Sequence, residues 1–379
     1  MKILFAGDLS FNYFNTLPTA EEAEGIMKKT AAYFKRADFS VLNLENIFGT
    51  PEGHTPITKS GPNLISDEGF CAFIDALSPT VVGLANNHSR DYGDAPMLAT
   101  RDLLLKKGYR VIGAGETIEK AYAPAVLEQD GIGVAIIAVN ENEFGIAGPH
   151  SAGTAGYHLT RVTKAIFSAK ERGQRPIIYF HGGNEYNPFP SPGKVALYRH
   201  FIDLGAEAVI AMHTHCPQGY EFYEGHPIVY SMGNFFFPSQ NERPTWGVGY
   251  MVQLTWDKKG IALEPIPYSF DFDRHEPMEG AQRERFLAYL QELNAPIGDP
   301  EALQRYFDGW CMEAGMKYAN HLSIPLDAEP ARLARLRNNF TCEAHNELVC
   351  NTLQILFEQR QEEAKKSLPE IERLQTFTF

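Results

Sequence analysis

The chain has 379 residues and carries 47 acidic side chains against 34 lysines and arginines, a formal charge of −13. The composition is 44% hydrophobic and 21% charged, as is typical of a globular protein, and this excludes a disordered or fibrous chain. The acidic balance also argues against a broad surface for nucleic acids or anionic membranes.

The first two thirds of the chain alternate short apolar runs with helix-like segments, a pattern typical of an α/β fold. Most of the apolar runs are nearly continuous, as expected for strands that are covered on both faces. The expected strands are residues 2–6, 39–44, 80–85, 110–113, 134–139, 176–180 and 208–212. The expected helices are residues 20–36, 67–77, 95–107, 161–171 and 192–204. A β-rich stretch follows at 227–237, 247–256 and 260–270, which either extends the sheet or forms a second one.

After residue 273 the apolar and charged residues follow helical intervals, and helices are expected at 281–293, 300–318, 329–338 and 343–367. We therefore expect a domain of residues 1–273 and a C-terminal helical extension of residues 274–379. The five cysteines form no C-x-x-C pair, and their odd number favours reduced thiols. With no long apolar stretch and no signal-peptide core, the sequence predicts a cytoplasmic protein without a membrane segment or a nucleic-acid partner.

Five expected strands end in side chains that can bind a metal ion. These side chains are Asp8, Glu45, Asn87 with His88, His181, and His213 with His215. Ligands of open α/β sheets bind at the carboxyl ends of the strands, so we expect these residues to converge along one sheet edge.

Each of these residues also has a structural interpretation when it is taken alone. Asp8 can cap a helix, Asn87 suits a turn, and a lone His181 is more often a hydrogen-bonded interior residue. The coincidence at five strand ends favours a shared site instead. Oxygen and imidazole donors without a thiolate suit Mn²⁺, Fe, Zn²⁺ or Mg²⁺. A carboxylate in the middle of the set would bridge two ions, and a histidine outside it could protonate a leaving group.

Motifs along residues 1–270 occur in the order of a known family. They are Gly7-Asp8, Asn43-Leu44-Glu45, Asn86-Asn87-His88-x-x-Asp91-x-Gly93, His181-Gly182-Gly183-Asn184-Glu185-Tyr186, His213-Thr214-His215 and Ile228-Val229-Tyr230-Ser231-Met232-Gly233-Asn234-Phe235. Together they resemble the bacterial CapA family of poly-γ-glutamate capsule synthesis proteins, which is related to the calcineurin-like metallophosphoesterases. The resemblance implies a four-layer α/β metallophosphatase-like sandwich, with two β-sheets flanked by helices, and a centre of two divalent metal ions (Mn, Fe or Zn).

The resemblance also implies roles for individual residues. The implied metal ligands are Asp8, Glu45, Asn87, His181, His213 and His215. His88 matches the histidine that assists the leaving group, and Asp91 either orients His88 or caps a helix. Ser10 stands where phosphoesterases have a histidine, which removes one imidazole from the site. Gly182 stands where the CapA family usually has tryptophan, which predicts a larger pocket or a different substrate.

The first functional hypothesis is a metal-dependent hydrolase in which a hydroxide bridging two metal ions attacks a phosphate ester. Two alternatives are hydrolysis or transfer of a γ-glutamyl amide, and a non-catalytic accessory role in poly-γ-glutamate (capsule) biosynthesis. The expected substrate is a small or polymeric anion. Its candidate binding residues are Lys59, Arg90, Glu185 and Asn234, each of which has a surface or turn role as its alternative.

Overall fold

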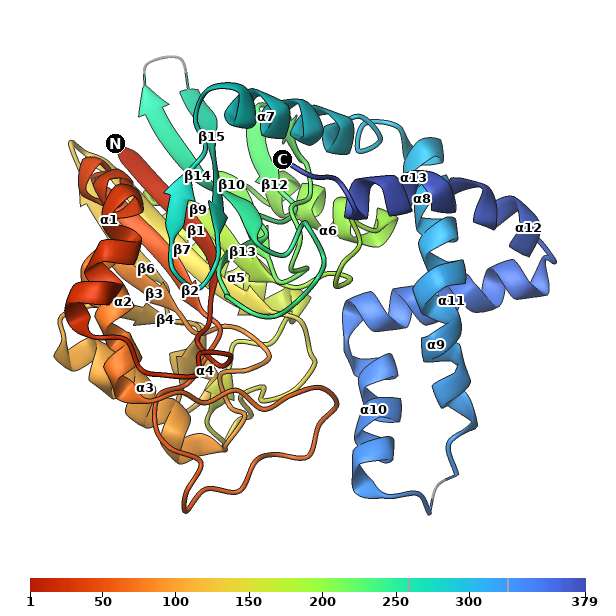
Figure 1. Ribbon diagram of the computed structural model, residues 1–379, viewed down its shortest axis with the longest axis horizontal. Coiled ribbons are helices and arrows are strands. Elements are labelled where there is room, and N and C mark those ends of the chain that lie inside the picture. Colours follow the sequence, from red (N-terminus) through yellow and green to blue (C-terminus); the bar gives the residue numbers. More distant parts are fainter. Residues whose placement is uncertain (258–259, 326) are drawn as a thin grey trace.

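The computed structural model describes residues 1–257, 260–325 and 327–379. Within these residues, two large β-sheets pack face to face, and helices cover their outer faces (Figure 1). This arrangement confirms the four-layer sandwich that the sequence predicts. A group of C-terminal helices, blue in Figure 1, lies at one side of the sandwich.

The first sheet has a parallel centre, in which β1, β2 and β3 run side by side. Strand β1 is buried at every position after Lys2, as expected from its nearly continuous apolar run. In spatial order the strands are β16 (His275–Pro277), β15 (Gly260–Phe270), β14 (Val248–Asp257), β1 (Lys2–Leu9), β2 (Phe39–Leu44), β3 (Val81–Gly83) and β4 (Arg110–Ile112), with β13 (Asn234–Phe236) also paired to β1.

The second sheet also has a parallel centre, with antiparallel strands at both edges. Its strands are β11 (Tyr220–Tyr223), β12 (His226–Val229), β10 (Ala208–Met212), β9 (Arg175–His181), β7 (Ile132–Asn140) and β6 (Ala125–Gln129). A small separate sheet pairs β5 (Ala114–Gly115) with β8 (Gly153–Thr154).

Helices pack on the outer face of each sheet. The first sheet is covered by α1 (Ala20–Arg36), α2 (Cys71–Leu77) and α3 (Asp94–Lys106), and the second by α5 (Leu159–Glu171) and α6 (Pro192–Asp203), while α4 (Ile118–Ala121) is a single turn. Helix α1 begins with a capping box, in which Thr19 Oγ1 accepts from the backbone N–H of Glu22 and the Glu22 carboxylate accepts from that of Thr19.

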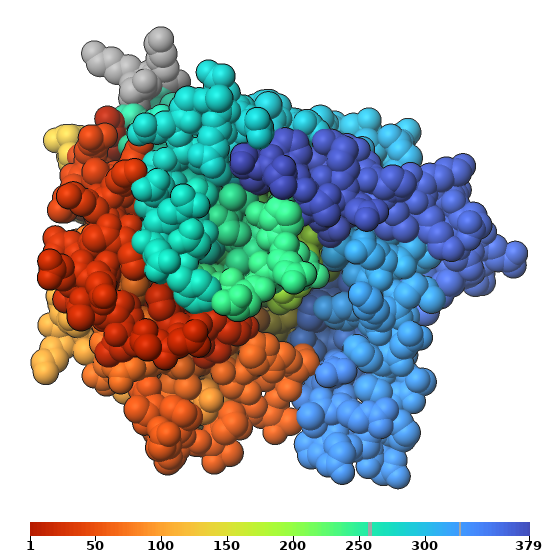
Figure 2. Space-filling model, in the orientation of Figure 1, coloured from red at the N-terminus to blue at the C-terminus, as the bar shows by residue number. Residues whose placement is uncertain are grey.

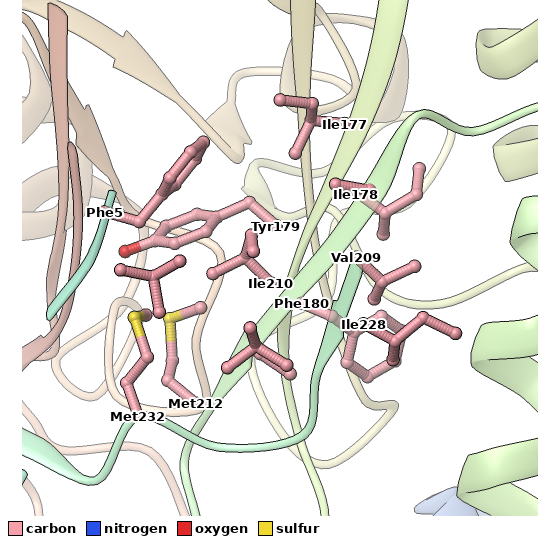
Figure 3. Close-up of a cluster of buried hydrophobic side chains, with 14 of the residues drawn as sticks. Phe5, Ile177, Ile178, Tyr179, Phe180, Val209, Ile210, Met212, Ile228 and Met232 are labelled. Carbon is pink, nitrogen blue, oxygen red and sulfur yellow. The ribbon is translucent and has the colours of Figure 1, made fainter. Parts of the chain in front are cut away.

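Apolar side chains fill the space between the two sheets. Figure 3 shows Tyr179 of β9 pointing toward Phe5 of β1, and their ring centroids are 6.0 Å apart. The Tyr179 hydroxyl donates to the carbonyl of Ala6, 2.6 Å away, which ties the two sheets together near the site. The next residue, Phe180, lies on the opposite face of β9, where its ring is 5.3 Å from that of Tyr198 in α6.

The structure corrects the expectation of a single sheet edge. Strands β1, β2 and β3 belong to the first sheet, whereas β9 and β10 belong to the second. The two sheets present the carboxyl ends of these strands at the same end of the sandwich, so the polar residues still meet. The β-rich stretch also divides, because β14 and β15 extend the first sheet while β12 joins the second.

The C-terminal helices are α7 (Gly280–Asn294), α8 (Pro300–Trp310), α9 (Met316–Ala319), α10 (Pro330–Thr341), α11 (Glu343–Phe357), α12 (Gln361–Ala364) and α13 (Leu368–Gln375). The expected continuous helix over 343–367 is wrong. Helix α11 ends at Phe357, and Gln359 has a φ of 57°, a left-handed conformation in which an α-helix cannot continue. Helix α7 packs against β11 and β15, so the extension begins on the sandwich itself. The domain division after residue 273 stays a prediction.

Candidate metal centre

The first carboxylate of the site is held in place by groups from three strand ends. Asp8 is fully buried at the end of β1, and its Oδ1 accepts a hydrogen bond from the Asn43 amide, 2.7 Å away. Its Oδ2 accepts from the backbone N–H of His213, 2.9 Å away. The Nδ1 of His181 lies 3.3 Å from Asp8 Oδ1. The sequence pattern did not identify Asn43 as a ligand-positioning residue, although its place in β2 beside Asp8 accounts for it.

The second carboxylate, Glu45, is fully buried, and neither of its oxygens has a hydrogen-bond partner within the described residues. Its Oε1 lies 3.8 Å from the Nε2 of His88 and 3.8 Å from the Nε2 of His181. Burial and the charges of Asp8 and Glu185 raise the pKa of Glu45 well above its ordinary value. A buried, unpartnered carboxylate is costly, and a bound cation would offset that cost.

Three histidines surround the two carboxylates. The Nε2 of His181 lies 2.9 Å from the Nδ1 of His213 and 3.0 Å from the Oδ1 of Asn87. Burial lowers the pKa of His213 well below its ordinary value, and the neighbouring His181 and His215 lower it further. Neutral imidazoles are the form that binds metals. The Nδ1 of His215 lies 2.8 Å from the Asn234 Oδ1, so Asn234 orients a candidate ligand here.

The donor atoms form two groups that share one carboxylate. Glu45, His181 and His213 place donor atoms within 4.8 Å of one another, and so do Asp8, Glu45 and His215. Asn87 adds an amide oxygen beside His181. This oxygen and imidazole set suits divalent cations such as Mn²⁺, Fe²⁺ or Zn²⁺. The position of Glu45 in both groups fits a bridge between two ions.

The paired histidines are held in uncommon backbone conformations. His213 has a φ of 107° and His215 a φ of 56°, both on the positive side that non-glycine residues rarely adopt. Such conformations cost about 1–3 kcal/mol each and persist where the surrounding structure fixes them. Here the hydrogen bond from the His213 N–H to Asp8 fixes the turn, which aims both imidazoles at the two carboxylates.

His88 stands beside the donor groups with polar partners on one side of its ring. Its Nδ1 lies 2.7 Å from Asp91 Oδ2 and 3.0 Å from the Nζ of Lys59. Lys59 and Asp91 also form a buried ion pair. Burial and the Lys59 charge lower the pKa of His88 to about 4, and Asp91 partly offsets this. With Nδ1 engaged, the Nε2 is the ring nitrogen on the Glu45 side.

The four candidate substrate-binding residues lie in different places in the structure. Asn234 contacts His215, and Lys59 is paired with Asp91, so both lie in the centre. Glu185 is exposed and lines the adjoining cavity. The guanidinium of Arg90 is 2.6 Å from Asp94 and does not line that cavity, so the structure does not bring Arg90 to the site.

A cavity of about 310 Å³ adjoins the centre. Asn87, His88, the loop from Lys59 to Pro62, Glu143 and Glu185 line one side. The opposite side consists of residues of the C-terminal helices, namely Tyr318, His321, Arg335, Asn338, Asn339 and His345. In Figure 1 the long orange loop after β2 reaches toward α10. Sequence reasoning missed these residues because they carry no recognisable motif.

The departure at Gly182 has a different consequence from the one that the sequence predicts. A Cβ at Gly182 would lie 2.5 Å from the Cγ of Glu141 and 2.8 Å from a ring atom of Phe180. The space beside Gly182 is therefore filled by Glu141, and the expected enlargement of the pocket at this position is wrong. At the other departure, the Oγ of Ser10 is buried without a hydrogen-bond partner in the described part of the chain.

Fold and site together define a four-layer α/β/β/α protein with a candidate two-metal centre at the strand ends. The particular family follows from comparison with known sequences. The chain belongs to the family of bacterial capsule synthesis proteins described as PGA_cap, whose model matches residues 2–239. This finding confirms the resemblance to the CapA family. The matched residues include all six candidate ligands and end before the C-terminal helices.

Two curated relatives show how far the likeness extends. The "PGA biosynthesis protein CapA" of Bacillus subtilis (strain 168) is 25% identical over 245 residues, which cover 62% of this chain and 62% of that protein. The "Capsule biosynthesis protein CapA" of Bacillus anthracis is 26% identical over 265 residues, covering 68% of this chain and 64% of that protein. The chain thus spans less than two thirds of the length of these relatives.

Among solved structures, a 5'-nucleotidase from Candida albicans SC5314 matches 91% of this chain and 57% of its own, with 10% identity and a TM-score of 0.40. A protein of Thermus thermophilus matches 70% of this chain and 98% of its own, with 14% identity and a TM-score of 0.36. Sequence identities and TM-scores this low carry no argument about this chain. Among the helices of the described residues, none is both long and apolar enough to cross a membrane.

Proposed function

We propose that the protein is a metal-dependent hydrolase that cleaves a phosphate ester. The observation that carries the proposal is the buried carboxylate of Glu45, which lacks a partner within the described residues and belongs to both groups of donor atoms. A shared carboxylate between two imidazole-containing groups is what a two-metal hydrolase needs. Two divalent ions, when bound, would activate a water molecule and stabilise the charge on the phosphoryl oxygens.

The protein's own residues supply the acid. The Nδ1 of His88 is held by Asp91 and Lys59, so its Nε2 can carry the proton that a departing oxygen requires. Burial and the charge of Lys59 favour the neutral ring, and the Nζ of Lys59 can donate to Nδ1, so the single ring proton lies on Nε2 and can pass to the departing oxygen. Asp91 acts as a positioning residue, since it contacts His88 and not the cavity.

The first experiment measures metal bound per chain by elemental analysis, after purification without chelator and supply of Mn²⁺, Fe²⁺ or Zn²⁺. We expect about two ions in the wild type and fewer in His215→Ala. In His88→Ala we expect unchanged metal content and a kcat reduced about 10²–10⁴-fold on phosphate esters. His150→Ala removes an exposed histidine elsewhere and serves as the control. Unchanged turnover in His88→Ala would contradict the assigned role.

A second candidate, hydrolysis or transfer of a γ-glutamyl amide, is supported by the names of the relatives, which refer to PGA and capsule biosynthesis. Two-metal centres also serve peptidases. Parallel assays of phosphate esters and γ-glutamyl peptides separate the two reactions. Metal binding without turnover of either class would favour an accessory role, a term that appears in the names of two mycobacterial relatives.

A further inference from the structure

The C-terminal extension is attached to the domain beside the metal centre by buried polar contacts. The carboxylate of Glu141, which follows β7, accepts hydrogen bonds from the backbone N–H of Gly183 at 2.9 Å and from that of Ala344 at 3.1 Å. Glu343 in turn accepts from the backbone N–H and the side-chain amide of Asn142, at 3.0 and 2.6 Å. The start of α11 is therefore fixed against the strand ends.

Further along α11, Glu347 accepts from the Ser191 hydroxyl at 2.5 Å and from the Gly193 N–H at 2.7 Å. These contacts join α11 to the start of α6, on the second sheet. Together with the contacts of Glu141 they hold α11 over the cavity, and α10 packs on α11. Figure 2 shows the blue extension and the orange segment of the chain meeting side by side. The cavity wall opposite His88 is therefore held in place by these hydrogen bonds.

The cationic side chains that line the cavity differ in whether they are free to bind a ligand. Lys59 is buried and paired with Asp91. Arg335 of α10 is exposed at the cavity and, within the part of the chain that the structure describes, forms no ion pair. Burial and, after it, the charge of Arg335 lower the pKa of His321, which lines the same cavity. A free guanidinium is well suited to carboxylate and phosphate groups because it presents a planar fork of donors.

Two other lining residues have polar atoms that lack partners. The Nδ1 of His321 and the Oδ1 of Asn338 are both buried and make no hydrogen bond within the described residues. Asn338 itself is 3% exposed, and both residues line the cavity with Arg335. Buried polar atoms are normally hydrogen-bonded. The Nδ1 of His321 can donate to an anionic ligand, whereas the Oδ1 of Asn338 only accepts and so fits a water molecule that enters the cavity. They lie on the C-terminal extension and are not among the six candidate metal ligands.

We infer that Arg335, supported by His321, binds a second anionic group of the substrate, on the side of the cavity formed by the C-terminal extension. This inference rests on the proposed function. The substrate class that it specifies is a small phosphate ester that also carries a carboxylate or a second phosphate. The volume of about 310 Å³ lies at the lower end for small-molecule sites, which agrees with a compact substrate.

The test measures equilibrium binding of phosphonates, which are not hydrolysed, to the full chain in the presence of Mn²⁺. Alkylphosphonates of increasing length are compared with the same compounds ending in a carboxylate or in a second phosphonate. At one length we expect the second anion to tighten binding about tenfold or more, as a charge-assisted hydrogen bond does. Arg335→Gln should abolish this advantage and leave the affinity for plain alkylphosphonates unchanged.

Arg337→Gln is the matched control, because Arg337 is an exposed arginine of the same helix that does not line the cavity. It should retain the full advantage of the second anion. If the wild type binds both series equally, or if Arg335→Gln keeps the advantage, the inference is wrong. If neither series binds to the wild type, the phosphoryl site itself is refuted, and the inference falls with it.

Discussion

Glu141 offers the most direct test of how the extension is held over the metal centre. The residue is 2% exposed and forms an ion pair with Lys194, which is similarly enclosed. Burial alone would raise the pKa of Glu141, but the charge and hydrogen bond of Lys194 and the N–H of Gly183 outweigh it and lower that pKa. Burial opposes the charged form of Lys194, but the charge of Glu141 raises the pKa of this lysine.

Glu141→Gln keeps the shape of the side chain and removes its charge, so Lys194 remains buried without its ion-pair partner. Breaking a buried pair in this way costs about 3–5 kcal/mol. We expect urea unfolding to show a loss of this size. The backbone N–H of Ala344, which donates to Glu141, should also exchange faster with solvent deuterium.

The double variant Glu141→Gln with Lys194→Met separates the charge from the packing. It should recover at least half of the lost stability, because no uncompensated charge remains. A single variant within about 0.5 kcal/mol of the wild type, a size typical of neutral surface changes, would refute the reasoning. So would a double variant that is as unstable as the single one.

The sign of the pH dependence gives a second readout of the same pair. Because the pKa of Glu141 is lower in the folded chain, its contribution is complete above the unfolded value of about 4.3. The contribution is lost as the pH falls through the lower, folded value. Wild-type stability should therefore decline more steeply than that of Glu141→Gln in this acidic window.

Two further predictions concern buried groups away from this pair. Glu45→Gln should stabilise the metal-free protein by about 1–3 kcal/mol, because burial disfavours the ionised form of this carboxylate, which has no partner in the described residues. The same variant should weaken Mn²⁺ binding, and urea unfolding with and without Mn²⁺ checks both effects. His275 is fully buried between Thr30 and the carbonyl of Phe235, and burial lowers its pKa to about 3. Because the unfolded chain binds a proton at His275 more readily, the free energy of unfolding of the wild type should fall by about 3 kcal/mol between about pH 6.5 and 4. The free energy of unfolding of His275→Gln should lack this decrease, as urea unfolding at the two pH values would show.

The sequence allowed the convergence of the candidate ligands to be predicted, because each of them lies at or just after the end of a strand that can be recognised locally. Asp8 and His181 come directly at the ends of buried apolar runs, and such runs predict strands by themselves. What the local pattern could not supply was the assignment of these strands to two sheets. That division depends on which strands pair, and β1 pairs with β14, which lies near the far end of the domain sequence.

The residues of the cavity wall could not be predicted from the sequence for a related reason. Arg335 and His345 lie on helices whose spacing predicts only that they pack on something. Their place over the centre depends on Glu141 accepting the N–H of Ala344, a contact across 203 positions. The break after α11 was also missed, because a left-handed Gln359 has no strong sequence signal of the kind that glycine or proline provides.

Gly182, the residue after His181, departs from the family pattern. This departure is related to the way in which the C-terminal extension is held. A side chain at Gly182 would collide with Glu141, whose Cγ and Cδ lie 2.5 and 2.7 Å from the position of a Cβ. An aromatic residue there and a Glu141 carboxylate that reaches the start of α11 therefore exclude each other in this structure. In this chain the space beside Gly182 holds a carboxylate that accepts from the start of α11. The same helices place Arg335 in the cavity wall, where the proposed second anion would bind.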